Sequence, residues 1–218
     1  MNIKTILITA AVVAGLGIVG SRYLGNTGMD DMPGMNHSNG TTDASPATAA
    51  FKISMDAMMK GMMVAPTGKP DLDFMQGMIP HHQGAIDMAK VVLQHGKNAE
   101  VKAFAENVVK AQAAEIAFMN AWLAKTDMNA LPTSADASKG NAAAMATMMK
   151  DMMVPYTGDA DVDFIKGMIP HHQGAIDAAK VALQFAQDPD VLKLAQDINS
   201  AQQGEITFMQ DWLKKQGK

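Results

Sequence analysis

The sequence predicts an all-α protein in which two duplicated helical units form one four-helix bundle. The first observation is an internal repeat, since the chain from Met55 to Lys125 aligns without a gap on Met145 to Lys215. Between Asp73 and Lys90 the two copies agree at 15 of 18 positions. The second observation is that apolar residues recur at helical spacing and no segment alternates with period two, as a half-buried strand would.

Each unit is expected to contain a short helix near 53–64, a long helix near 71–95 and a second long helix near 99–125. Asp71 and Asp161 are predicted N-caps of the first long helix, and Pro189 suits the first turn of the last one. Two long helices cannot cover both of their apolar faces, whereas four suffice for a core. The bundle should therefore have pseudo-twofold symmetry, with the short helices lying against it or capping its ends.

The N-terminus is typical of an export signal. Lys4 precedes an apolar run from Ile6 to Val19 that is short for a membrane span. Whether the segment is cleaved or kept as an anchor, it predicts a periplasmic or otherwise extracytoplasmic protein. The protein would contact the membrane only through this segment, and only if the segment is not cleaved. The chain is expected to have five segments: a signal peptide or anchor at 1–21, a disordered linker at 22–50, a first unit at 51–127, a connection at 128–140 and a second unit at 141–218.

The amino-acid composition limits the kinds of ligand that the chain could bind. The formal net charge is -4 and no Lys/Arg cluster occurs, which excludes nucleic acid as a partner. The chain has no cysteine and 21 methionines. If a metal is bound, imidazole and thioether must bind it, and this ligand set suits soft monovalent copper or silver. Avoidance of cysteine also fits an oxidising compartment, although cysteine could simply have been unnecessary.

Methionines form a stripe on each short helix, at positions i, i+3, i+4, i+7 and i+8. The stripes consist of Met55, Met58, Met59, Met62 and Met63 in the first unit, and Met145, Met148, Met149, Met152 and Met153 in the second. Packing is the alternative explanation, because any amphipathic helix shows this spacing and methionine fills gaps. Leucine defines a core better than flexible methionine, so ten methionines at ten stripe positions favour soft-metal coordination.

The repeated sequence GMIPHHQGAID carries an adjacent histidine pair in each unit. At about 100° per residue, His82 lies at the centre of an apolar arc, and His172 repeats this position. His81 and His171 point about 100° away. They are expected at the rim of the bundle, near Met78 and Met168, where they would be the better candidates for an accessible copper site. A hydrogen-bonded core role is the alternative for His82 and His172.

A carboxylate stands on an otherwise apolar face of the second long helix in both units. Glu115 lies between Ala111 and Phe118, and Glu205 repeats the arrangement. A carboxylate in a core is costly unless it is paired, hydrogen-bonded or metal-bound. We expect Glu115 to orient His82 and Glu205 to orient His172. Carboxylates that hydrogen-bond to metal-ligating histidines orient the imidazole in the same way. A structural His-Glu pair without metal is the alternative.

The linker contains the segment MDDMPGMNH, which brings together Met29, Met32, Met35 and His37. A disordered string of ligands can wrap a metal ion without a preformed cavity. Chance enrichment in a polar tail is the alternative explanation.

At GMIPHHQGAID and at the AQxxEIxFMxxWL segments, Ala111 to Leu123 and Ala201 to Leu213, the chain resembles the family known as domain of unknown function 305. The resemblance spans residues 51 to 215, and the best understood kind in this family is the CopM-type periplasmic copper-binding protein. It implies a ferritin-like helical bundle, export, and binding of Cu(I) and Ag(I) in copper tolerance. The implied ligands are Met78, His81 and His82 with Met168, His171 and His172, and the methionine stripes provide further sites.

The leading hypothesis is therefore a non-enzymatic protein that sequesters or transfers Cu(I), with Ag(I) or Cu(II) as further candidate ions and a copper-transfer protein as a candidate partner. A ferritin-like carboxylate oxidase would need Glu-x-x-His motifs on facing helices, and the sequence has none. No Ser/His/Asp or Cys/His arrangement indicates hydrolysis. The other hypothesis is a structural or interaction module whose His-Glu pairs fix helix register.

Overall fold

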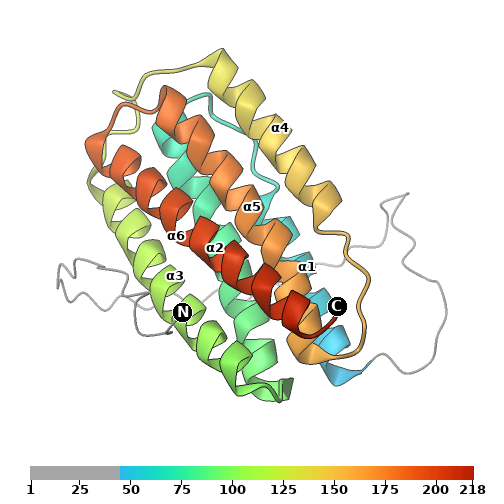
Figure 1. The fold of residues 1–218 in the computed structure, drawn as a ribbon. Helices are drawn as coiled ribbons and strands as arrows, with labels where there is room; N and C mark the ends of the chain where they lie inside the picture. The colour runs from blue at the N-terminus through green and yellow to red at the C-terminus, as the bar shows by residue number, and fades with distance from the viewer. Residues whose placement is uncertain (1–44) are drawn as a thin grey trace, which may run out of the picture. The chain divides into compact units, whose positions relative to one another are not determined.

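The computed structural model describes residues 45–218, which form six α-helices and no strand (Figure 1). The helices are α1 (Pro46–Met62), α2 (Pro70–His95), α3 (Ala99–Lys125), α4 (Ala135–Asp151), α5 (Ala160–Phe185) and α6 (Pro189–Lys215). The four long helices are those that the sequence predicts, and the all-helical bundle of two duplicated units is confirmed.

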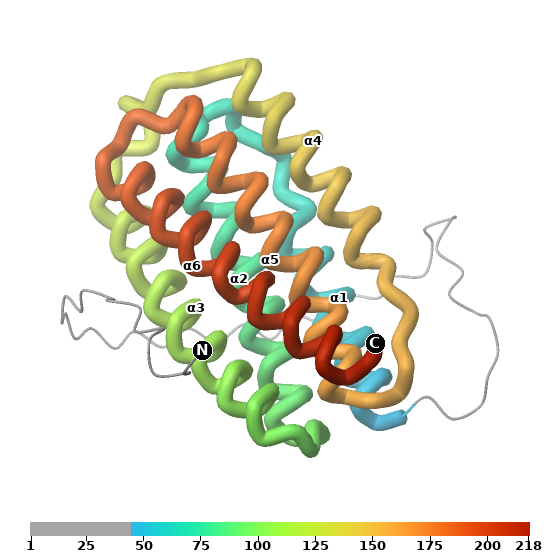
Figure 2. The backbone as a smooth tube through the Cα atoms, in the orientation of Figure 1, coloured from blue at the N-terminus to red at the C-terminus, as the bar shows by residue number. Residues whose placement is uncertain are grey.

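Helices α2 and α5 pack against each other at the centre, with α1 and α3 on α2 and with α4 and α6 on α5 (Figure 2). Two residues of α2 show which of its sides face α3 and α1. His82 bonds to α3, whereas a Cβ at Gly84 would meet Met58 of α1. Two residues correspond to about 200° of rotation, so α1 and α3 lie on nearly opposite sides of α2. The short helices therefore cover the central pair along its length and do not cap its ends.

Both short helices begin earlier than the sequence predicts. Helix α1 starts at Pro46 because the Ser45 hydroxyl accepts a hydrogen bond from the Thr48 amide. Helix α4 starts at Ala135 with Ser134 as its cap. In each case a serine cap extends the helix into a stretch of small residues whose composition resembles a linker. Pro189 does occupy the first turn of α6.

The prediction that Asp71 and Asp161 cap their own helices is wrong. Asp71 is fully buried and accepts hydrogen bonds from the amides of Gln187 and Asp188, at 3.0 and 2.8 Å. Asp161 likewise accepts from the amides of Lys97 and Asn98, at 2.8 and 3.0 Å. Each carboxylate thus binds the loop between the two long helices of the other unit, so these contacts join the units.

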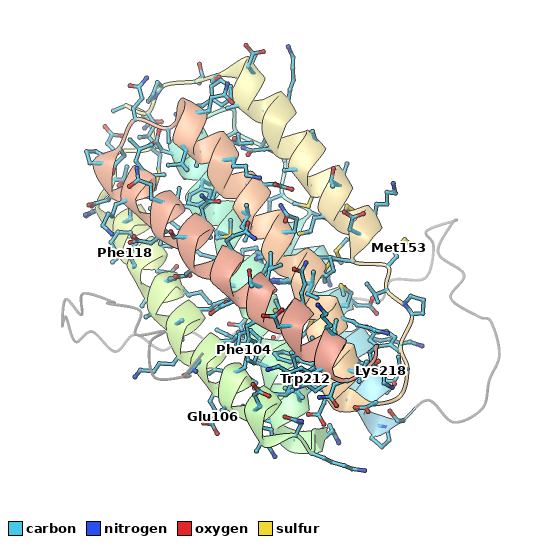
Figure 3. The ribbon with its side chains drawn as sticks, in the orientation of Figure 1. Phe104, Glu106, Phe118, Met153, Trp212 and Lys218 are labelled. Carbon is cyan, nitrogen blue, oxygen red and sulfur yellow. The ribbon has the colours of Figure 1, made fainter. Side chains whose placement is uncertain are left out.

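The apolar face of α3 departs from the predicted one at Phe118. Phe118 is 40% exposed and points outward (Figure 3), whereas Met119 and Trp122 are buried. Gln112 is buried beside them. The equivalent Phe208 of α6 is partly buried, and its ring lies 5.0 Å from that of Phe104. The two units therefore pack this aromatic position differently, although the residue is the same.

We predict opposite effects for two glycine-to-alanine substitutions in α2. A Cβ at Gly84 would lie 2.6 Å from the Met58 side chain, so Gly84→Ala should lower the free energy of unfolding by about 1–3 kcal/mol. Gly77 has nothing within 4 Å of such an atom, and Gly77→Ala should raise it by roughly 0.5–1 kcal/mol. Urea unfolding of both variants measures this contrast, and equal effects would contradict the close α1–α2 contact.

Candidate metal centre

The structure brings together the two histidine-glutamate pairs that the sequence predicts. His82 Nε2 lies 2.5 Å from Glu115 Oε2, and His172 Nε2 lies 2.6 Å from Glu205 Oε2. Both histidines are fully buried, whereas the side chains of Glu115 and Glu205 are 23% and 11% exposed. Each glutamate therefore holds an imidazole on α2 or α5 from the neighbouring long helix.

His81 and His171 do not lie at the rim, so that prediction is wrong. They are 2% and 0% exposed, and their ring centroids are 3.7 Å apart between α2 and α5. Each Nε2 lies 3.1 Å from the backbone carbonyl oxygen of the other histidine. The arc that carries His81 faces α5, because the second unit packs there and covers what one unit alone would expose.

These contacts determine the tautomer of the central rings. A carbonyl oxygen only accepts, so Nε2–H of His81 and of His171 must donate. Burial lowers the pKa of both rings well below 6.5, and the neighbouring His82 and His172 lower it further. A neutral ring with hydrogen on Nε2 carries a lone pair on Nδ1. That lone pair is free to bind a metal.

The Nδ1 atoms of the four core histidines are buried and have no hydrogen-bond partner among residues 45–218. The residues concerned are His81, His82, His171 and His172. A buried acceptor without a partner costs roughly 1–3 kcal/mol, so most such atoms in proteins are paired. The four Nδ1 atoms are therefore candidate ligand atoms.

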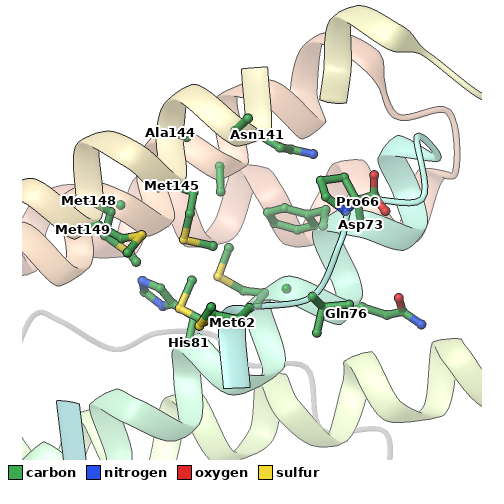
Figure 4. A pocket seen from close by; sticks show the side chains of 18 of the residues that line it. Met62, Pro66, Asp73, Gln76, His81, Asn141, Ala144, Met145, Met148 and Met149 are labelled. Atoms are coloured by element: carbon green, nitrogen blue, oxygen red, sulfur yellow. The ribbon is translucent and has the colours of Figure 1, made fainter. Parts of the chain in front are cut away.

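Methionines of both short helices line a groove of about 580 Å³ beside these rings. Its walls come from α1 and the loop after it, from the first half of α2, from α4 and from α5. Seven thioethers and one imidazole line it: Met59, Met62, Met63, Met78, Met145, Met148, Met149 and His81. Figure 4 shows sulfur atoms from α1 and α4 gathered on the same side as the His81 ring.

The other predicted ligands lie outside this groove. These described residues do not line it: Met55, Met58, Met152, Met153, Met168, His82, His171 and His172. Met63 and Met153 are 74% and 76% exposed, whereas Met58 and Met148 are buried against Gly84 and Gly174. Met29, Met32, Met35 and His37 lie outside the described residues. The stripe positions thus range from exposed to buried, and both the exposed Met63 and the buried Met148 also line the groove.

Carboxylates and histidines alone do not build a metal site in the described helices. Within residues 45–218, no three His, Asp or Glu side chains are placed so that they could hold a metal ion together. The thioethers that line the groove are further candidate ligands in this part of the chain.

Comparison with known proteins gives the family. The family model described as domain of unknown function (DUF305) matches residues 71–213. The chain belongs to the DUF305 family. A further relative is the uncharacterized protein L153 of Acanthamoeba polyphaga mimivirus, which is 42% identical over 53 residues, or 24% of this chain and 35% of that protein. The chain therefore matches about a third of that relative's length.

Solved DUF305-like structures share the fold. The Ag-bound form of CopM is 33% identical, with a TM-score of 0.52 over 70% of this chain and 98% of CopM. CopM has also been solved with Cu(I) and with Cu(II). A DUF305 protein from Streptomyces coelicolor, described as secreted, is 28% identical, with a TM-score of 0.55 over 70% of this chain and 96% of that one. Among residues 45–218, no helix is long and apolar enough to span a membrane.

We predict that the metal-free protein loses stability as pH falls below about 6.5. The pKa of His81 and of His171 is lowered by folding, so below pH 6.5 the unfolded chain binds more protons than the folded one. Above that pH these two histidines do not lower the free energy of unfolding. Below it, the free energy of unfolding falls by up to about 1.4 kcal/mol per pH unit for each histidine. Urea unfolding between about pH 7.5 and pH 4.5 measures this slope.

The control is the double variant His81→Gln/His171→Gln. Its amides can still donate to the two carbonyls but do not titrate, so its stability should depend less steeply on pH. An unchanged slope would show that the central histidines do not govern acid sensitivity.

Proposed function

We propose that this DUF305 protein binds soft monovalent metal ions, Cu(I) and Ag(I), through methionine and histidine. The observation that carries the proposal is the groove that seven thioethers line beside His81, whose buried Nδ1 has no hydrogen-bond partner within the described residues. Thioether sulfur and neutral imidazole are soft or borderline ligands without charge, and thioethers select Cu(I) over hard divalent ions.

The groove suits exchange better than permanent storage. Met62 and Met145 are half-buried and Met149 is exposed, so an ion can enter and leave without unfolding a helix. His81 beneath them supplies a nitrogen whose position is fixed by the Nε2 contact to α5. A rigid nitrogen below flexible thioethers would accept ions of slightly different size. For this reason we propose both Cu(I) and Ag(I) as ligands of the groove.

The wider role that we propose is sequestration, tolerance or transfer of copper outside the cytoplasm, without catalysis. The metal-bound forms of CopM support the choice of ions, and the secreted Streptomyces coelicolor relative supports the location. The apolar run from Ile6 to Val19 agrees with export. Transfer would require a copper-accepting partner protein.

The alternative is a structural or interaction bundle in which histidine-glutamate pairs only fix helix register. The observation in its favour is that the pairs recur in both units with nearly equal distances, 2.5 and 2.6 Å. Buried polar pairs of this kind can specify one packing arrangement. The two functions differ in what happens to metal binding when individual side chains change.

We predict that Met62→Leu/Met145→Leu weakens Ag(I) binding at least about tenfold, because it removes one thioether from each side of the groove. Leucine and methionine have similar volumes, so stability should change by less than about 1.5 kcal/mol. Isothermal titration with Ag(I) and native mass spectrometry measure affinity and stoichiometry.

The matched control is Met119→Leu/Met209→Leu, which changes two fully buried methionines outside the groove. It should bind Ag(I) as the unsubstituted protein does. If both double variants bind equally well, the groove is not the soft-metal site.

We predict that Glu115→Gln lowers the free energy of unfolding by about 1–3 kcal/mol while leaving Ag(I) stoichiometry unchanged. Glutamine keeps the shape but loses the charged acceptor for His82, which does not line the groove. The exposed Glu106 of the same helix provides the control Glu106→Gln, which should be neutral (Figure 3). Loss of bound Ag(I) in Glu115→Gln would instead place a metal at His82 and give the glutamate the orienting role that the sequence suggested.

A further inference from the structure

The ligands of the groove are present twice in the chain. Adding or subtracting 90 from each lining methionine and from His81 gives an identical residue type in the other unit. The second set consists of Met149, Met152, Met153, Met168, Met55, Met58, Met59 and His171. Met59 and Met149 belong to both sets, as expected for residues close to the pseudo-twofold axis. Ligand chemistry alone therefore predicts two equivalent sites.

Residues between the ligands break this equivalence. In the groove, Asn141, Pro66 and Ala178 line the space around the thioethers. The equivalent positions hold Phe51, Tyr156 and Met88, and all three side chains are larger. Phe51 and Tyr156 stack on each other, with ring centroids 6.2 Å apart and planes inclined by 14°. The aromatic pair occupies the place that corresponds to open space in the first set.

Burial differs in the same direction at these three positions. Phe51 and Met88 are buried, whereas Asn141 and Ala178 are only partly so. Tyr156 is partly buried and the corresponding Pro66 is exposed.

Among the ligand pairs, the clear difference is that Met152 is 6% exposed whereas its counterpart Met62 is half-buried. Met63 and Met153 are equally exposed, at 74% and 76%. Burial also raises the pKa of Tyr156, with smaller contributions from Asp163 and Asp56, as expected in surroundings of low polarity. The part of the second set around Met152 and His171 is therefore more deeply buried than its counterpart around Met62 and His81.

We propose that the two methionine-histidine sets have diverged into an open groove around His81 and a closed cluster around His171, with Phe51 and Tyr156 as the cover. The open groove takes up the ion, and the closed cluster does not load while the aromatic pair remains stacked. The metal part of this proposal rests on the proposed function, whereas the difference in access does not. Residues 51 and 156 thus decide how many of the duplicated sites are available to metal.

Access can be tested without any metal by oxidising the metal-free protein with hydrogen peroxide. Peroxide converts exposed methionine to its sulfoxide, and the rate follows exposure. Peptide mass spectrometry over a time course should show Met62 oxidised several times faster than its counterpart Met152. Phe51→Asn/Tyr156→Ala should bring Met152 to the rate of Met62. Equal rates in the unsubstituted protein would overturn the proposal.

Metal uptake provides the second test, by Ag(I) titration with native mass spectrometry. Phe51→Asn/Tyr156→Ala should bind one ion more than the unsubstituted protein. The reverse change, Asn141→Phe/Pro66→Tyr, should lose the ion of the open groove, and it keeps the proposal testable if the first variant fails to fold. Circular dichroism establishes that each variant is helical.

The outcomes separate the two proposals. If the unsubstituted protein binds no Ag(I), the proposed function fails, and the oxidation rates alone decide whether the cluster is closed. If it binds Ag(I) but neither folded double variant changes the stoichiometry, the aromatic cover has no role in uptake and the further inference is overturned.

Discussion

The reciprocal contact of His81 and His171 is the constraint on which the rest of the bundle depends. Each imidazole donates to the other's backbone carbonyl across the pseudo-twofold axis, so neither unit can satisfy its own histidine. This contact sets the rotation of α2 and α5 about their axes. The adjacent His82 is then directed to Glu115, and Gly84 is directed to Met58 of α1. The adjacent pair His81 and His82 thus determines which sides of α2 face α5, α3 and α1.

The sequence predicts contacts within a unit better than contacts between units. Glu115 and His82 could be paired because each lies centrally on an apolar face of neighbouring helices. His81 was misplaced because a helical wheel gives directions but not the number of neighbours, and α5 covers an arc that one unit would expose. Asp71 was misassigned for the same reason, since its partners at Gln187 and Asp188 are more than a hundred residues away. No local signal identifies such partners.

The two explanations of the methionine stripe apply to different positions of the same helix. Met58 and Met148 pack where Gly84 and Gly174 lack a side chain, and a branched residue would not fit there easily. Met62 and Met145 face the groove, and Met63 and Met153 are exposed. Flexible thioethers would be a poor choice for all of these positions if packing were the only requirement. A gradient from buried to exposed sulfur would instead provide a path for the soft ion that we propose.

Burial of the histidines links metal uptake to stability. An unpaired buried Nδ1 costs roughly 1–3 kcal/mol, and a ligand that binds only the folded state returns stability as RT ln(1 + [L]/Kd). His81 lines the groove, so an ion bound there as we propose would complete its Nδ1, whereas His171 does not line the groove. Under this proposal the two halves of a nearly exact duplication would differ in energy, because metal would relieve the cost at His81 and not at His171.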